Sequence, residues 1–213
     1  MAKRIIFTGA QGTGKSTVLN MFKEAGFPVI TEVVRNMVKD KGIKINREGN
    51  DETQTLIFNE YKRVLSEERD YVSDRGLTDV LAYTIDGVAD GNISTDVEVQ
   101  QCEDIVNFVH DNEDVIWVYF PIEFPVVADG VRSTDEHYRE TIDYIIHSLL
   151  KELEVNYLEV HGTPEERFKQ IMDFEEDLDL KLYNERKTSS LHKCIVELFK
   201  RVKSHITQKN AKD

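Results

Sequence analysis

Residues 9–16 read Gly-Ala-Gln-Gly-Thr-Gly-Lys-Ser and fit the pattern G-x-x-x-x-G-K-[ST]. Glycine loses more conformational freedom on folding than any other residue, so three glycines within six positions need a physical reason. In this pattern the backbone N–H groups of the turn surround phosphate oxygens, and side chains at the glycine positions would block that approach. The stretch therefore predicts a phosphate-binding turn, which we call the phosphate loop (residues 9–16).

The residues on either side of the phosphate loop match the context that such a turn requires. Residues 5–7 are Ile-Ile-Phe, typical of a short buried strand, and Val18, Leu19 and Phe22 recur at helical spacing. A helix that begins near Lys15 points the unpaired N–H groups of its first turn at the anion. Lys15 is expected to reach the terminal phosphates of ATP. The residues predicted to bind ATP are Gln11, Gly12, Thr13, Gly14, Lys15, Ser16 and Thr17.

Length, charge and composition exclude several classes of protein. A chain of 213 residues is long enough for one domain with its own core. The net charge of −13 repels nucleic acid at long range and disfavours a nucleic-acid partner, although it does not exclude a local basic cleft.

No apolar run approaches the roughly 20 residues that span a bilayer, and the apolar stretch at the N-terminus is too short for a secretory signal. We expect a cytoplasmic protein without a membrane partner, whose two cysteines match no metal or redox spacing.

Short apolar runs alternate with longer amphipathic ones along the rest of the chain. Strands are predicted at residues 5–7, 27–31, 71–73, 115–120 and 157–160. Helices are predicted from about residue 15, over 51–69, 78–86, 98–110 and 135–153, from residue 163, and over 190–206. Strands separated by helices indicate an α/β fold with a parallel sheet covered on both faces.

A phosphate loop of this kind works with a metal ion, because Mg²⁺ bridges the phosphates and offsets their charge. The Ser16 hydroxyl is the first predicted ligand. Asp74, which follows the strand predicted at residues 71–73, is the second, and Arg75 is predicted to pair with the phosphoryl group in transit. The alternative is that Asp74 and Arg75 only cap a turn.

The residue after Asp74 also bears on the type of reaction. ATP-hydrolysing proteins with this loop usually carry a second acid there to orient water, and this chain has Arg75. GTP-binding proteins with this loop need an Asn-Lys-x-Asp sequence, which does not occur in the chain. Phosphoryl transfer from ATP to a bound acceptor is therefore favoured. The alternative, which belongs to a different functional class, is an ATPase or a nucleotide-sensing module that has no phosphoryl acceptor.

Transfer to a hydroxyl needs a base aimed at that hydroxyl and cations around the phosphoryl group. Glu32, which closes the second predicted strand, is the candidate base or a substrate ligand, and Arg35, about one helical turn further on, is predicted to hold Glu32 or the substrate. Gln54 is predicted to bind the substrate, as an amide facing a base edge. Phe58 and Tyr61 on the same helix fit either a nucleobase pocket or the core. Glu32 and Arg35 could equally form an exposed surface pair.

Two arginines lie between the fourth predicted strand and the next helix. A lid that closes over phosphates would be expected at this position. We predict Arg132 as a catalytic residue and Arg139 as a substrate-binding residue. The alternative is that both pair with acids on the helix surface.

Four segments taken together resemble a known family. Residues 9–17, 31–35, 73–83 and 129–140 are similar to the AAA-like P-loop group of small kinases, which includes nicotinamide riboside kinase domains and many phage proteins. The similarity to deoxynucleoside kinases is more distant. The resemblance extends over about residues 3–172. It implies a three-layer P-loop NTPase fold of the NMP-kinase type with five parallel strands, in which the strand ending at Asp74 lies beside the strand that precedes the loop.

The resemblance also implies roles for individual residues. Glu32 would act as the base or as a sugar ligand, and Asp74 and Arg75 occupy the place of an acid–Arg pair. This chain has Asp-Arg-Gly where those kinases usually have Glu-Arg-Ser. The implied cofactors are ATP and Mg²⁺, and the implied acceptor is a small nucleoside- or nucleotide-like molecule, with a base or end of DNA as the runner-up.

The domain organisation expected from these patterns is simple. Residues 1–178 form a P-loop kinase domain, and residues 179–213 form a helical extension that packs on the same domain. The extension matches no pattern that we recognise. The sequence leaves the oligomeric state open between a monomer and a dimer.

Overall fold

The computed structural model describes residues 3–43, 45, 49–125 and 135–181. Within these residues five strands form one sheet in the order β2-β3-β1-β4-β5, and every neighbouring pair is parallel. The strands are β1 (Arg4–Thr8), β2 (Val29–Ile30), β3 (Tyr71–Asp74), β4 (Ile116–Tyr119) and β5 (Tyr157–Glu159). The predicted five-stranded parallel sheet is confirmed, as is the prediction that the strand ending at Asp74 lies beside β1.

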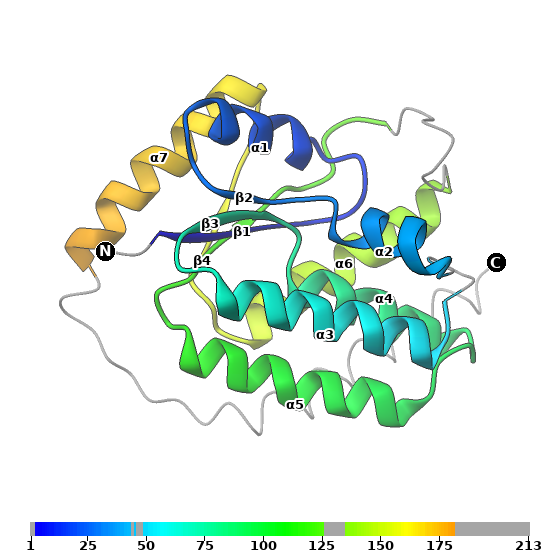
Figure 1. Ribbon diagram of the computed structural model, residues 1–213. Coiled ribbons are helices and arrows are strands. Elements are labelled where there is room, and N and C mark those ends of the chain that lie inside the picture. The colour runs from blue at the N-terminus through cyan, green and yellow to red at the C-terminus, as the bar shows by residue number, and fades with distance from the viewer. Residues whose placement is uncertain (1–2, 44, 46–48, 126–134, 182–213) are drawn as a thin grey trace.

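Helices cover both faces of the sheet and give the molecule three layers (Figure 1). The helices are α1 (Lys15–Glu24), α2 (Val33–Lys41), α3 (Asp51–Glu67), α4 (Leu77–Ala89), α5 (Thr95–Asp111), α6 (Glu136–Glu152) and α7 (Pro164–Lys181). Helices α1 and α7 pack together on one face, whereas α3, α4, α5 and α6 cover the other. None of the helices in the described part of the chain is long and apolar enough to cross a membrane.

The alternation of side chains along β1 divides the core into two parts. Ile5 and Phe7 pack with Phe22 of α1 and Ile171 of α7, whereas Ile6 belongs to the larger cluster under α3 to α6. A parallel sheet buried on both faces needs apolar residues at consecutive positions, and this run supplies them. Each fully buried side chain of this kind contributes roughly 1.5–3 kcal/mol. The sheet is thereby a rigid base for the loops at its carboxyl edge.

Two helices that adjoin the phosphate loop begin with side-chain caps. The Asp135 carboxylate accepts a hydrogen bond from the Tyr138 amide at 3.1 Å and starts α6. The Thr163 hydroxyl accepts from the Glu166 amide at 3.3 Å, and Glu166 accepts from the Thr163 amide at 2.8 Å. Reciprocal bonds of this type satisfy N–H groups that have no partner within a helix. The helix start predicted at Thr163 and Pro164 is confirmed.

The structure differs from the sequence prediction at the second strand and in the segment after it. Strand β2 has only two residues, and the helix α2 that follows it was not predicted. Helix α7 extends to Lys181, and the division of the chain at residue 178 stays a prediction. The predicted helix at residues 190–206 lies outside the described residues, so the C-terminal extension stays a prediction.

Candidate functional site

The phosphate loop runs from the end of β1 into α1, at the carboxyl edge of the sheet, and its shape depends on glycine. Gly9 has φ +137°, and a Cβ there would lie 2.5 Å from the carbonyl oxygen of Phe120. Gly14 has φ +90° and directly precedes the first turn of α1. Residues that carry a side chain rarely adopt these backbone conformations, so the predicted need for glycine in this turn has a direct steric basis.

The loop forms one wall of a cavity of about 260 Å³. Residues from α2, α3, the end of β3 and α4 form the other walls. The predicted site residues that line this cavity are Gln11, Gly12, Thr13, Gly14, Lys15, Ser16, Thr17, Glu32, Arg35, Gln54, Asp74 and Arg75. The fold thus brings the predicted nucleotide, metal and acceptor residues together from four separate segments of the chain. Arg132 lies outside the described residues.

Lys15 lies inside the curve of the loop. Its Nζ donates hydrogen bonds to the carbonyl oxygens of Gly9 at 2.7 Å and Ala10 at 2.6 Å, and to Thr13 Oγ1 at 3.1 Å. Burial, together with a smaller contribution from nearby Arg75, lowers the pKa of Lys15 to about 7. A phosphate anion in the loop would exchange neutral acceptors for charged ones and would therefore favour the charged lysine.

The two predicted metal ligands touch each other. Ser16 Oγ donates a hydrogen bond to Asp74 Oδ2 at 2.7 Å, which joins the start of α1 to the end of β3. A hydroxyl and a carboxylate are the oxygen donors that Mg²⁺ prefers, with phosphates and water as its remaining ligands. The described residues hold no cluster of three or more His, Cys, Asp or Glu side chains that could bind a metal by itself. The residues present fit Mg²⁺ bound together with phosphates.

Arg75 is held in place by two residues that sequence reasoning missed. Its Nη1 lies 3.2 Å from Oδ1 of Asp79, and its guanidinium lies 5.7 Å from the centre of the Tyr83 ring. Asp79 is fully buried and also accepts a hydrogen bond from the Gly76 amide at 3.1 Å. Burial raises the pKa of Asp79, whereas Arg75 and Lys15 oppose that rise. The spacing of four residues between Arg75 and Asp79 was the available signal.

Glu32 and Arg35 form an ion pair at the rim of the cavity, with Arg35 Nη1 2.9 Å from Glu32 Oε1. Their exposed fractions, 44% and 54%, leave both side chains accessible to a ligand. Glu32 has φ +60° and Arg75 has φ +92°, and they are two of the three non-glycine residues with positive φ in the described chain. Such conformations cost about 1–3 kcal/mol each and gather at functional sites.

The wall opposite the loop combines an amide, aromatic rings and aliphatic side chains. Gln54 is 3% exposed, and its Oε1 lies 3.5 Å from the Thr84 hydroxyl. Tyr61 lines the cavity and donates a hydrogen bond to the Asp74 carbonyl at 3.3 Å, whereas Phe58 packs in the core. Apolar atoms come from Val33, Val34, Ile45, Ile57 and Val80. This wall suits a flat, partly polar ligand.

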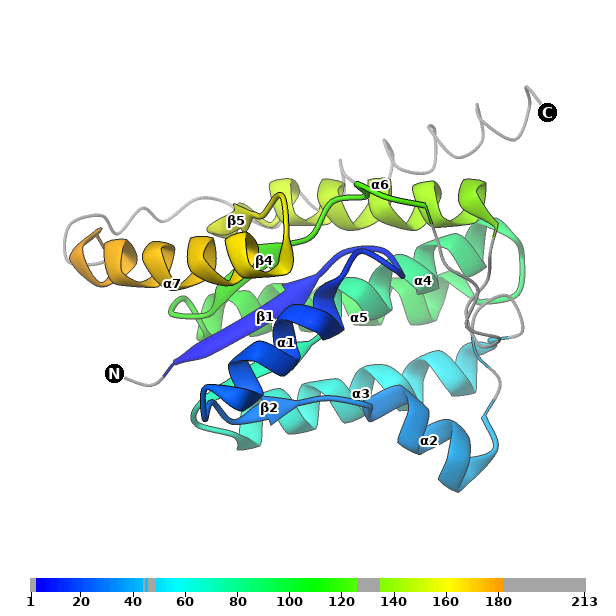
Figure 2. The ribbon, with the colours of Figure 1, turned by 90° about the horizontal axis from the view of Figure 1, so that it is seen from above.

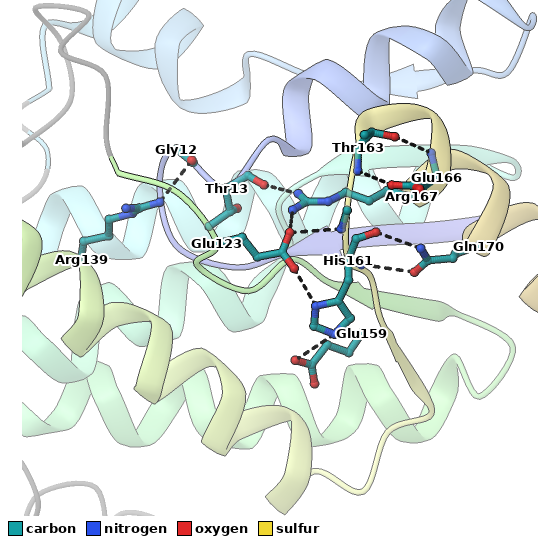
Figure 3. Close-up of polar contacts among 11 residues, drawn as sticks. Gly12, Thr13, Glu123, Arg139, Glu159, His161, Thr163, Glu166, Arg167 and Gln170 are labelled. Atoms are coloured by element: carbon teal, nitrogen blue, oxygen red, sulfur yellow. Dashed lines mark hydrogen bonds and ion pairs between the residues drawn. The ribbon is translucent and has the colours of Figure 1, made fainter.

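The structure does not bring Arg139 into the cavity. The residue is 1% exposed and lies behind the loop, where Nε donates to the Gln11 carbonyl at 2.9 Å. Its Nη2 donates to the Gly12 carbonyl at 3.2 Å (Figure 3). It pairs with Glu136 at 3.2 Å, but its burial distinguishes it from a surface helix residue. Arg167, which the sequence did not single out, contacts the same loop through Thr13.

Residues 4–167 match a protein family described as an AAA domain. The chain belongs to this AAA domain family. The family resemblance inferred from the four sequence segments is thereby confirmed. No curated protein matches the sequence.

Solved structures show that this AAA domain chain has the P-loop kinase fold. A deoxyadenosine kinase from M. mycoides has a TM-score of 0.59 and 17% identity, over 82% of this chain and 99% of the kinase. The NadR protein has a TM-score of 0.63 and 15% identity, over 82% of this chain and 52% of NadR. Shikimate kinase from Aquifex aeolicus has a TM-score of 0.51 and 22% identity, over 83% of this chain and 98% of that enzyme.

Proposed function

We propose that the protein is a kinase that transfers the terminal phosphoryl group of ATP to a hydroxyl or phosphate of a small nucleoside- or nucleotide-like molecule. One observation carries the proposal. The phosphate loop, the Ser16–Asp74 pair, Glu32 and Arg75 all line a single cavity. A donor phosphate and an acceptor bound there would meet away from the bulk of the solvent.

Each group in this cavity has a part in the proposed transfer. An oxygen of the acceptor forms a bond to the γ-phosphorus, the bond from that phosphorus to the bridging oxygen breaks, and ADP leaves. Where the acceptor is a hydroxyl, its proton passes to the Glu32 carboxylate. Lys15 and Arg75 offset the negative charge of the transferring group. When bound at Ser16 and Asp74, Mg²⁺ would offset the charge of the phosphates.

The ligands of the structural neighbours support the nature of the acceptor. The M. mycoides deoxyadenosine kinase structure holds dCMP and dCDP, and the NadR structure is a complex with NR. The amide of Gln54 and the rings of Tyr61 and Tyr83 line this chain's cavity on the acceptor side. Amides and aromatic rings suit the edge and the face of a nucleobase.

The test is ATP consumption in the presence of a panel of nucleosides, nucleotides and other small hydroxyl compounds. We expect a sharp rise with one class of acceptor and a new phosphorylated product. Turnover of equal rate with and without acceptors would identify an ATPase instead. Phosphorylation of a DNA oligomer while free nucleosides and nucleotides stay inert would identify a DNA-directed kinase.

A further inference from the structure

Two buried arginines contact the outer side of the phosphate loop, away from the cavity (Figure 3). Arg139, from α6, donates to the carbonyl oxygens of Gln11 and Gly12. Arg167, from α7, donates through Nη1 to the carbonyl oxygen of Thr13 at 2.6 Å. Three consecutive carbonyl groups of the loop are thus bound by two guanidinium groups, each of which is 1% exposed.

These contacts determine where the N–H groups of the loop point. In a planar trans peptide the carbonyl and the following N–H lie on opposite sides, and the described chain contains no cis peptide. Holding the carbonyls of Gln11, Gly12 and Thr13 outward therefore turns the N–H groups of Gly12, Thr13 and Gly14 toward the opposite side. These residues line the cavity on that side.

Each guanidinium is fixed by groups outside the loop. Nη1 of Arg139 donates to the Phe124 carbonyl at 2.9 Å. Arg167 forms an ion pair with Glu123, and its guanidinium lies 5.7 Å from the Phe120 ring centre and 5.4 Å from the Phe124 ring centre. A planar group held between rings and a carboxylate has little freedom to turn. The loop is therefore anchored to side chains that are themselves fixed.

Glu123 connects Arg167 to the turn between β5 and α7. Its Oε1 lies 2.7 Å from Nδ1 of His161, and its Oε2 accepts from the Gly162 amide at 3.2 Å. The side-chain amide of Gln170 in α7 makes two hydrogen bonds to the His161 backbone (Figure 3). Its Nε2 donates to the His161 carbonyl oxygen at 2.9 Å, and its Oε1 accepts from the His161 N–H at 3.2 Å. Burial disfavours the charged carboxylate of Glu123, but the bonds from His161 and Arg167 outweigh it and lower its pKa.

Burial of two guanidinium groups requires an explanation, because desolvation of a charge costs several kcal/mol and an ion pair repays it only in part. Well-packed apolar residues would stabilise the same contacts between helices at least as well. Apolar side chains could not bind three carbonyl oxygens. The burial of these arginines is therefore better explained by a role in fixing the backbone of the phosphate loop than by a contribution to the stability of the fold.

We propose that Arg139 and Arg167 are positioning residues that hold the N–H groups of Gly12, Thr13 and Gly14 in the orientation that binds phosphate oxygens, and that Glu123 acts through Arg167. The inference rests on the proposed function, because it assumes that the loop binds a nucleotide. It differs from direct binding of substrate by Arg139, since the guanidinium need not touch the phosphates.

The first test is the affinity for ADP, measured by calorimetry with Arg139→Lys and Arg167→Lys. Lysine keeps the charge, but its single ammonium cannot reproduce the planar fork of arginine. We expect each variant to bind ADP roughly 10- to 100-fold more weakly, the scale of one lost hydrogen bond from a buried charged group. Arg63→Lys is the matched control, because Arg63 pairs with Glu60 and Glu67 on the exposed side of α3. Unchanged ADP affinity in both variants would overturn the inference.

A second measurement separates positioning from a merely structural role. In ¹⁵N-labelled protein we expect the amide resonances of Gly12, Thr13 and Gly14 to shift when ADP binds, because N–H groups that donate to phosphate are deshielded. The lysine variants should show smaller shifts at these amides and an unchanged spectrum for α5. Full shifts in variants that bind ADP weakly would point to direct charge contact and would overturn the inference.

Glu123→Gln keeps the size of the side chain and serves where a lysine variant fails to fold. We expect it to weaken ADP binding on its own and to cause no further loss in an Arg167→Lys background. Independent, multiplying losses would contradict the proposed path through Arg167. Wild-type protein that binds no nucleotide would overturn the proposed function as well, whereas ADP binding without phosphoryl transfer would overturn the kinase proposal and leave this inference standing.

Discussion

Lys15 is held by three oxygen atoms of its own loop, at the place where it is expected to meet phosphate oxygens. Two adjacent carbonyl groups give partial negative charge but no net charge, so they compensate the burial of the ammonium only in part. Burial therefore lowers the pKa of Lys15 to about 7 despite these contacts. The protonation of this one residue is thereby linked to nucleotide binding.

Nucleotide affinity is expected to fall as the pH rises above about 7. Below that pH Lys15 is charged in both states, so its titration has no effect on binding. Above it, the free protein must take up a proton to bind, because phosphate raises the pKa of Lys15 again, and affinity falls by up to about tenfold per pH unit. Calorimetry with ADP from about pH 7.5 to 9, above the phosphate pKa near 6, measures this dependence.

The control for this pH dependence is Lys15→Met, which has no titrating group at the position. Its ADP affinity should be weak and independent of pH in the same range. A wild-type affinity that does not change between these pH values would contradict the linkage. Two buffers of different ionisation enthalpy would report the proton uptake directly.

Asp74→Asn is expected to raise the Mg²⁺ concentration needed for half-maximal activity. The amide keeps the size of the side chain and can still contact the Ser16 hydroxyl, but it lacks the charge that attracts a divalent cation. Asp70→Asn is the matched control, because Asp70 is exposed, directly precedes β3 and contacts only the backbone of Lys3 among the described polar contacts. An unchanged Mg²⁺ dependence in Asp74→Asn would exclude this residue from the metal site.

Glu32→Gln is expected to leave ATP binding intact and to lower kcat by about 10²- to 10⁴-fold, the range for loss of a general base. The amide preserves the shape of the side chain and the contact with Arg35, but it cannot accept a proton. Glu24→Gln at the exposed end of α1 is the control. If kcat holds and only the KM of the acceptor rises, Glu32 is a substrate ligand and not the base.

At the scale of the elements, α1 depends on one aromatic cluster. The Phe22 ring is fully buried, and its centre lies 5.7 Å from Phe7, 5.2 Å from Phe27 and 4.6 Å from Phe168. Phe22→Ala should lower the free energy of unfolding by about 3–5 kcal/mol, measured by urea denaturation. Val99→Ala on α5, where the side chain is 50% exposed, should change it by less than about 0.5 kcal/mol. Equal effects of the two changes would contradict this account of the core.

Most elements could be predicted because their signals are local. The strand before the phosphate loop and the helix after it follow from apolar spacing within twenty residues, and Asp135 and Thr163 mark helix starts by type alone. Helix α2 has no such signal. Its N-cap is Glu32, which has a left-handed conformation and whose side chain makes no capping hydrogen bond, and neither feature can be inferred from the sequence. The residues Glu32 and Arg35 were singled out because Glu32 closes the second predicted strand and Arg35 follows one helical turn later, and the family resemblance agreed with that choice.

At the scale of the whole molecule, contacts between distant segments decide what sequence reasoning misses. Arg139 bonds to a loop residue 128 positions away, and Arg167 to one 154 positions away. No local pattern distinguishes a buried arginine with such partners from one on a helix surface. The place of Arg139 between the fourth predicted strand and the next helix pointed to this residue, but only the fold shows which side of the loop it contacts.

The charge of the whole molecule leads to a prediction about its acceptor. A protein that grips duplex DNA through Z phosphates loses affinity with a log–log salt slope near −0.9Z. With a net charge of −13, we expect no gel shift of duplex DNA and little salt dependence of activity on a nucleoside between about 50 and 200 mM. Saturable phosphorylation of a DNA oligomer that collapses over this range would contradict that expectation.

Strand β1 is the central strand of the sheet, and different parts of the candidate site lie on its two sides. Helices α2 and α3, with the end of β3, lie on one side and supply the proposed acceptor wall, whereas α6 and α7 lie on the other and hold the back of the phosphate loop (Figure 2). The residues that line the proposed acceptor wall and the residues that hold the back of the phosphate loop are largely different. Substitutions in the acceptor wall are therefore expected to leave the contacts behind the loop unchanged. If the proposed function holds, new acceptors could be accommodated by exchange of the cavity-lining residues of α2, α3 and α4, without change to the residues that hold the back of the phosphate loop.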